Sequence, residues 1–167
     1  MEHFMKIYIG MRWNYVKEEN HVLEKLKALN LDGVKFIGLH SGDCLVEKYG
    51  ITKASSADVA RVLATEIGKD PQNSKGIGFC KTGWGVEIYA NTYQDVLAGK
   101  AVSPKDAENM VKVAGLDILC LPVEPLPKNW KNIAVKFITT QPDFSDPDCL
   151  NIRQSLLRAK NPNMVIR

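Results

Sequence analysis

The chain alternates short apolar segments, typical of β-strands, with longer segments in which apolar residues recur at helical spacing. The strand-like segments cover residues 6–10, 34–37, 76–80, 96–98 and 117–121. Helical periodicity extends to residue 29 after the first of them, and also covers 55–67, 103–114, 130–137 and 146–160. Strands that alternate with helices form βαβ units. The sequence therefore predicts an α/β fold, a three-layer αβα sandwich around a Rossmann-like, five-stranded parallel sheet.

Two of the predicted helices carry start and stop signals. Ser55 is expected to cap the beginning of one helix, and Gly68 is expected to end it. Ser103, which is followed by a proline, begins another helix, and Gly115 ends it. Residues 40–54 show no clear periodicity and are expected to form a loop.

The length of 167 residues suits one domain with a continuous core. We expect residues 1–140 to form the αβα domain, and residues 141–167 to add a helix and tail that pack on it or on a partner subunit. Hydrophobic residues make up 45% of the chain and charged residues 25%, as in ordinary globular proteins. Because the net charge is only +3 and both signs are interspersed, we expect neither a nucleic-acid nor a membrane partner.

The sequence favours a cytoplasmic protein. No apolar run reaches the roughly 18 residues needed to cross a bilayer, and the first residues lack the apolar core of a signal peptide. The four cysteines, Cys44, Cys80, Cys120 and Cys149, are far apart and do not have the spacing of a zinc site. We therefore expect reduced cysteines and no metal.

The segment that follows the third predicted strand, residues 80–85, is the strongest candidate for chemistry. Parallel sheets bind ligands at this edge, and its glycines allow a tight turn that brings backbone N–H groups close to a ligand. A helix beginning near Trp84 would add the positive end of its dipole. That dipole and the adjacent Lys81 would favour a thiolate at Cys80. A buried cysteine beside an ordinary strand–helix turn has the same pattern, so the residues alone leave both interpretations open.

The segment 76–85, Gly-Ile-Gly-Phe-Cys-Lys-Thr-Gly-Trp-Gly, resembles the Gly-Ile-Leu-Ile-Cys-Gly-Thr-Gly-x-Gly signature of the ribose-5-phosphate isomerase B and galactose-6-phosphate isomerase family. Further matches, in the same order and spacing over roughly residues 5–140, lie at Met5–Gly10, at Gly38–Ser41, at Ile88, Ala90 and Asn91, and at Leu119–Leu121. The resemblance implies a cofactor-free isomerase of carbohydrate metabolism, as in the pentose phosphate reactions. It also implies a homodimer or tetramer in which two subunits share each site.

The resemblance assigns roles to individual residues. The family converts an aldose phosphate to a ketose phosphate through an enediolate, which needs a base and donors for the oxyanion. Cys80 would be the base, and Thr82 would hold the oxyanion together with the backbone of Lys81, Gly83, Trp84 and Gly85. Residues expected to bind the phosphorylated sugar are Arg12, Trp13, His40, Asn91 and Arg153.

The chain also departs from the family pattern. Met11–Tyr15 stands where the family has Ser-Asp-His-Ala-Gly, whose Asp and His help to bind and open the sugar ring. The family's ring-opening histidine falls at Val113, and a tyrosine that lines its site falls at Ser56. A phosphate-binding arginine falls at Leu97, and one glycine of the signature is Lys81.

These departures keep other functions open beside aldose–ketose isomerisation. His40 would compensate for the missing ring-opening groups, and Arg12, Lys81 or Arg153 would engage the phosphate, with Arg12 as the leading candidate. Trp13 and Trp84 would either stack on a sugar or fill the vacated pocket. One alternative is a catalytically degenerate member that binds a phosphorylated metabolite or serves as a non-catalytic subunit. Another is a different reaction on the same scaffold, with Cys80 as a nucleophile.

Overall fold

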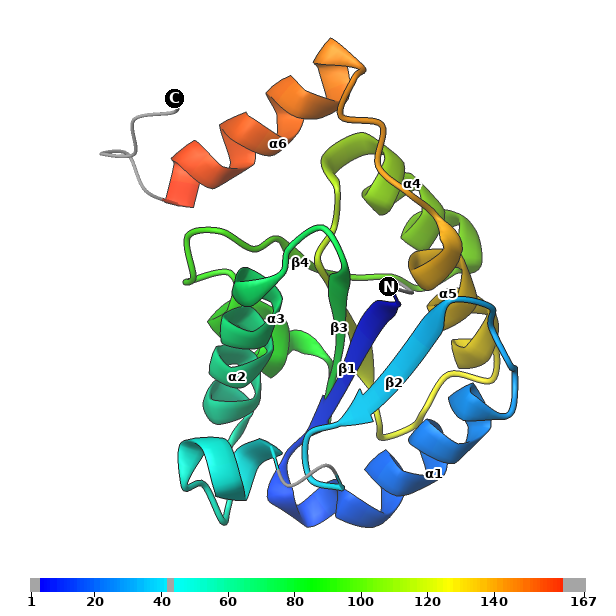
Figure 1. Cartoon of the computed structure of the whole chain (residues 1–167), viewed down its shortest axis with the longest axis vertical. Coiled ribbons are helices and arrows are strands. Elements are labelled where there is room, and N and C mark those ends of the chain that lie inside the picture. The colour runs from blue at the N-terminus through cyan, green and yellow to red at the C-terminus, as the bar shows by residue number, and fades with distance from the viewer. Residues whose placement is uncertain (1–3, 42–43, 161–167) are drawn as a thin grey trace.

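Five parallel strands form the sheet in the computed structural model, which describes residues 4–41 and 44–160. They are β1 (Met5–Met11), β2 (Val34–Gly38), β3 (Ser74–Cys80), β4 (Ala98–Lys100) and β5 (Ile118–Pro122). Their order across the sheet is β2-β1-β3-β5-β4, and all neighbours are parallel (Figure 1). The carboxyl ends of all five strands therefore meet at one edge, which we call the carboxyl edge.

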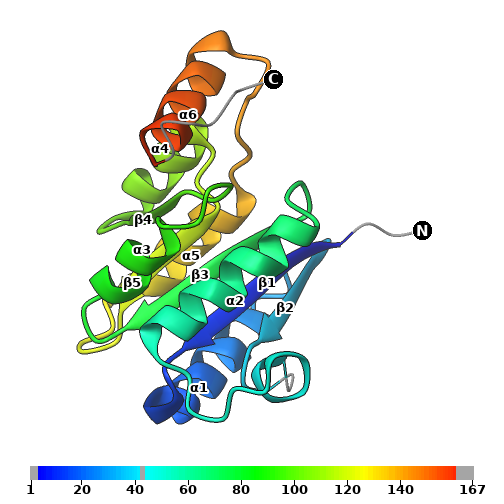
Figure 2. The same cartoon turned by 90° about the vertical axis from the view of Figure 1, so that its left-hand side faces the viewer.

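Helices cover both faces of the sheet (Figure 2). One face packs against α1 (Val16–Lys27), α4 (Pro104–Ala114) and α5 (Trp130–Thr139), and the other against α2 (Ser56–Lys69) and α3 (Trp84–Ala90). A last helix, α6 (Pro147–Lys160), lies beside α4, at the end of the sheet away from the carboxyl edge (Figure 1). This arrangement confirms the predicted three-layer αβα sandwich.

Side chains of the central strands alternate between the two cores, as the period of two requires. On β3, Ile77 and Phe79 are fully buried in the core beneath α1, α4 and α5. On the opposite face, β3 presents Gly78, where a Cβ atom would lie 2.5 Å from Val86 of α3. Because Gly78 has no side chain, α3 packs directly on the strand backbone. That packing fixes the position of the loop that joins β3 to α3.

Local signals placed most helix ends correctly. The Ser55 side chain accepts a hydrogen bond from the Asp58 N–H in a capping box, and Gly115 ends α4 with a φ of 66°. The prediction for Gly68 was wrong, because α2 continues through Lys69 and is capped at Asp70. A glycine inside the last turn costs some stability but does not end a helix that tertiary packing supports.

Two further differences concern segments without strong periodicity. β4 begins at Ala98 rather than at residue 96, since Leu97 bonds Asp117 and the first residues of β5 before the ladder starts. The predicted loop over 40–54 contains a π-helical turn, η2 (Cys44–Lys48). A 3-10 turn, η1 (Trp13–Tyr15), joins β1 to α1.

Within residues 4–41 and 44–160, no helix is long and apolar enough to span a membrane.

Candidate active site

The carboxyl edge brings the loop after β3 next to the residues that follow β1 and β5. Met11 pairs with Phe79 in the β1–β3 ladder, and Cys80 pairs with Pro122 in the β3–β5 ladder. Arg12 comes directly after Met11, and Cys80 comes directly after Phe79. Because neighbouring strands lie roughly 4.8 Å apart, Arg12 and Cys80 occupy adjacent backbone positions at this edge.

The loop after β3 is shaped around the sulfur of Cys80. Cys80 is only 4% exposed, and the Gly83 N–H donates a hydrogen bond of 3.1 Å to Sγ. Gly83 has a φ of 82°, in the left-handed region that favours glycine. A Cβ atom there would also lie 3.1 Å from the backbone carbon of Leu121. Glycine is therefore required at this position by both its own conformation and the neighbouring strand.

Gly85 leaves room for a single atom beside the sulfur. A Cβ atom on Gly85 would lie 3.5 Å from Cys80 Sγ and 3.5 Å from the Ser56 hydroxyl oxygen. The missing side chain of Gly85 therefore leaves room for a ligand atom between a thiol and a hydroxyl. The sequence marked Ser56 only as the place of a missing tyrosine, whereas the structure brings its hydroxyl to the candidate site.

The outer part of the loop is exposed. It is contacted by Lys100 of β4, which sequence reasoning missed. The Thr82 hydroxyl oxygen accepts a bond of 3.3 Å from the Trp84 N–H, and its carbonyl accepts one of 2.9 Å from Lys100 Nζ. Lys100 also lies over the Trp84 ring, 5.4 Å from its centroid. Its position at the end of the weakest predicted strand was the only sequence signal for this cation.

Lys81 and Arg12 supply further positive charge, and an unpredicted carboxylate opposes it. Lys81 Nζ lies 3.7 Å from Glu124 Oε2, and Tyr15 donates a hydrogen bond to the other carboxylate oxygen. The hydrogen bond to Glu124, together with burial, raises the pKa of Tyr15. Both Lys81 and Glu124 are exposed, so their ion pair is weak. Arg12 Nε is buried and has no hydrogen-bond partner among the described residues.

A buried carboxylate holds the ends of β1 and β2. Glu19 of α1 is fully buried, and its Oε2 accepts a 3.1 Å hydrogen bond from the Met11 N–H. Its Oε1 accepts a 2.9 Å bond from the His40 N–H. Burial raises the pKa of Glu19 to about 7. The His40 ring lies beside this carboxylate. Its Nε2 is 2.8 Å from the Met11 carbonyl oxygen and 3.8 Å from Glu19 Oε2.

A sequence signal for Glu19 existed but was not used. Tyr15, Glu19, Val22 and Leu26 recur at helical spacing, so Glu19 interrupts the apolar stripe of α1. A carboxylate on a buried stripe needs hydrogen-bond partners, and here they come from two strand ends.

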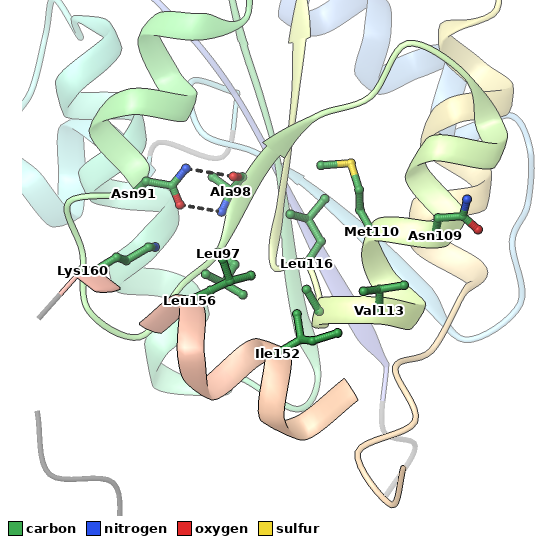
Figure 3. Close-up of a pocket in the computed structure, with 11 residues that line it drawn as sticks. Asn91, Leu97, Ala98, Asn109, Met110, Val113, Leu116, Ile152, Leu156 and Lys160 are labelled. Carbon is green, nitrogen blue, oxygen red and sulfur yellow. Dashed lines mark hydrogen bonds between the residues drawn. The ribbon is translucent and has the colours of Figure 1, made fainter. Parts of the chain in front are cut away.

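The structure does not bring Asn91 or Arg153 to the carboxyl edge of the same chain. The Asn91 amide exchanges two hydrogen bonds with Ala98, of 2.8 and 3.0 Å, and so ties α3 to the start of β4 (Figure 3). Arg153 of α6 pairs with Asp117 at 2.9 Å, directly before β5, and donates to the Gly115 carbonyl. Both side chains are engaged at the opposite, amino end of the sheet.

An apolar cavity also lies toward that amino end. It measures about 590 Å³ and opens between α4 and α6 (Figure 3). Its apolar lining includes Leu97, Met110, Val113, Leu116, Ile152 and Leu156. None of the residues of the Cys80 loop lines it. We place the candidate active site at the carboxyl edge, because the nucleophilic, acidic and basic groups meet there and the cavity lining has few polar groups.

The two predicted aromatic residues are both exposed at the carboxyl edge. Trp13 is 46% exposed, and Lys53 Nζ lies 5.5 Å from its ring centroid. Trp84 is 61% exposed beneath Lys100. Neither ring fills a buried pocket in the chain, and each pairs with a cation.

One comparison with known proteins identifies a family. The family model described as Ribose/Galactose Isomerase matches residues 14–148. A search of curated proteins finds no match.

Solved structures share the fold over nearly the whole chain. Type B ribose 5-phosphate isomerase from Leishmania infantum is 20% identical, with a TM-score of 0.75 over 95% of this chain and 98% of that one. Ribose-5-phosphate isomerase B from Mycoplasma genitalium, solved with bound ribulose-5-phosphate, is 24% identical, with a TM-score of 0.69 over 93% and 95%. The Thermotoga maritima ribose 5-phosphate isomerase is 23% identical, with a TM-score of 0.70 over 91% and 97%.

Proposed function

Because this chain belongs to the Ribose/Galactose Isomerase family, we propose that it interconverts an aldose phosphate and a ketose phosphate, of the ribose-5-phosphate or galactose-6-phosphate type. The observation that carries the proposal is the setting of Cys80 Sγ, which accepts a hydrogen bond from the Gly83 N–H and lies, with the Ser56 hydroxyl, at contact distance from the position of a Cβ atom on Gly85. Isomerisation needs a base next to a carbon-bound proton and donors next to the adjacent oxygens.

In the proposed reaction Cys80 is the base. As a thiolate it removes the proton from the carbon beside the carbonyl and returns it to the former carbonyl carbon. The hydroxyl proton on the carbon that lost its C–H proton moves to the former carbonyl oxygen, so that the aldose and ketose differ only in the positions of protons and of the C=O double bond. The Gly83 N–H, which donates to Sγ at 3.1 Å, stabilises negative charge on the sulfur.

The oxyanion and the phosphate would be held by the surrounding loop and cations. The backbone of residues 81–85 and the Thr82 hydroxyl face the developing enediolate in this proposal. Arg12 is the leading phosphate ligand, because its buried Nε has no partner among the described residues. Lys81 and Lys100 add positive charge on either side of the loop, and exposed lysines can reorient toward an anion.

We further propose that the enzyme acts in the cytoplasm as a homodimer. Asn91 and Arg153, the two predicted substrate ligands at the amino end of the sheet, would reach a sugar only in the site of another subunit. The resemblance to enzymes with shared sites supports this assembly.

The test is a coupled assay of aldose–ketose conversion on five- and six-carbon sugar phosphates. Cys80→Ala is expected to lower kcat by at least about 100-fold, the usual effect of removing a catalytic base. Cys149→Ala is the matched control, because Cys149 is equally buried on α6 but far from the loop. A folded wild-type protein without activity on any substrate would contradict the proposal.

One observation supports the alternative of a binding protein without catalysis. Glu124 pairs with Lys81 where an anion would otherwise bind, and its negative charge opposes phosphate. Titration calorimetry with sugar phosphates separates the two functions. Binding without turnover would favour the alternative, while turnover that depends on Cys80 would exclude it.

A further inference from the structure

Glu19 and His40 form a unit that the proposed roles of Cys80 and its loop do not explain. The Glu19 carboxylate bonds the N–H groups at the ends of two strands, and the His40 ring packs beside it. His40 keeps 12% of its side-chain surface exposed, whereas Glu19 has none. The unit thus has one member that reaches the surface of the carboxyl edge and one that does not.

The geometry fixes the tautomer of the neutral His40 ring. A carbonyl oxygen can only accept a hydrogen bond, so Nε2 must carry the proton that it donates to the Met11 carbonyl at 2.8 Å. The lone pair is therefore on Nδ1, which becomes the atom that can take up a proton. After that uptake, the imidazolium would lie 3.8 Å from Glu19 Oε2, within ion-pair distance of the carboxylate.

We propose that His40 transfers the proton that opens the sugar ring, and that Glu19 is the positioning residue. By bonding the Met11 and His40 N–H groups, Glu19 holds the His40 ring beside the Met11 carbonyl, which sets the competent tautomer, and it faces the ring when the ring is protonated. This inference rests on the proposed isomerase function. It assigns to Glu19 a role beyond binding two backbone N–H groups, which a purely structural carboxylate would also perform.

The step balances without any other reactant. An aldopentose 5-phosphate is closed through O4, as a five-membered ring. His40 Nδ1 accepts the proton of the C1 hydroxyl while the C1–O4 bond breaks and the C1 carbonyl forms. The same proton then passes from Nδ1 to O4. The open aldehyde is the form that Cys80 can isomerise.

The groups that contact Glu19 can be named one by one. Glu19 is surrounded by the His40 ring and by backbone N–H groups of Met11, His40 and Ser41. Within residues 4–41 and 44–160, His40 is the only charged or titratable side chain that forms an ion pair or hydrogen bond with Glu19.

The experiment compares a step that needs ring opening with one that does not. Conversion of an aldopentose 5-phosphate needs it. Exchange of the C1 protons of a pentulose 5-phosphate with solvent deuterium does not, because its C5 oxygen carries the phosphate and the sugar stays open. Glu19→Gln and His40→Gln are expected to lower the first rate about 100-fold and to leave the second within about threefold. In His40→Gln the new amide can still donate to the Met11 carbonyl.

Glu66→Gln is the matched control for losing a buried carboxylate. Glu66 is 3% exposed on α2 and bonds Tyr49 and Lys69, away from the strand ends. This variant should lose stability and keep both rates. If Glu19→Gln lowers both rates equally, or leaves ring-dependent conversion unchanged, the proposed positioning role is wrong.

Nuclear magnetic resonance of the imidazole nitrogens decides the inference even if the protein has no isomerase activity. The wild type is expected to show the Nε2–H tautomer for His40, and Glu19→Gln should lower the population of this tautomer. An Nδ1–H tautomer, or an unchanged tautomer population in a folded variant, would overturn it. Loss of isomerase activity in the wild type alone would instead overturn the proposed function.

Discussion

The Gly83 N–H lies 3.1 Å from the sulfur of Cys80, and Gly83 reaches that position only with a φ of 82°. Gly83→Ala should therefore move the donor away from the sulfur. A left-handed alanine costs about 1–2 kcal/mol, and its Cβ atom would lie 3.1 Å from the backbone of Leu121. We expect a loss of at least that size in the free energy of unfolding, measured in urea, together with a marked fall in kcat.

Gly68→Ala provides the opposite control. Gly68 lies inside α2, and a Cβ atom there would contact nothing within 4 Å. Alanine should stabilise the helix by about 0.5–1 kcal/mol and leave activity unchanged. Equal effects of the two substitutions would show that the backbone of Gly83 has no special role.

The pKa of Glu19 predicts how stability depends on pH. Burial raises this pKa from 4.5 to about 7 in the folded chain, so between these values the folded state binds more protons than the unfolded state. The free energy of unfolding should therefore fall as the pH rises from 4.5 to 7, by at most about 3 kcal/mol. Urea denaturation at pH 5 and pH 8 measures the difference. Glu19→Gln should reduce it, and an unchanged difference would contradict the assignment.

Lys75 stabilises the amino half of the sheet and should not affect chemistry. It is 6% exposed, and its Nζ donates to the Phe137 and Thr140 carbonyls at the end of α5, each at 2.8 Å. Burial lowers its pKa to about 8. Lys75→Met leaves these carbonyls without that donor and should cost about 1–3 kcal/mol in thermal or urea unfolding, with kcat unchanged. Lys35→Met, at an exposed position on β2, should change neither.

Arg153 attaches α6 to the sheet through its pair with Asp117. Arg153→Met leaves a buried carboxylate without its cation and should lower the free energy of unfolding by about 3 kcal/mol. The double variant with Asp117→Asn should recover part of this loss, because the uncompensated charge is gone. The KM for a sugar phosphate, measured in parallel, tests the predicted substrate role. An increase of tenfold or more in a stable Arg153→Lys variant would support that role.

The sequence alone specified the fold and the position of the candidate loop. The strand and helix periodicities arise because one face of a strand, or one stripe along a helix, is buried. The spacing of apolar residues along the chain shows this directly. Helix ends at Ser55 and Gly115 were predictable because a capping hydrogen bond or a left-handed φ involves only neighbouring residues. The loop at Cys80 was predictable for the same reason, since the strand–helix connection itself places it at the carboxyl edge.

Only the tertiary structure determined which side chains meet there. Glu19 and His40 are 21 residues apart, and Tyr15 and Glu124 are 109 apart. Their contacts depend on the strand order β2-β1-β3-β5-β4, which local periodicity does not encode. Asn91 lies at the amino end of the sheet because α3 runs back from the carboxyl edge to the start of β4, and Arg153 lies there because α6 packs beside α4. A residue's type and spacing describe what it can do, whereas its partners are set by which strands become neighbours.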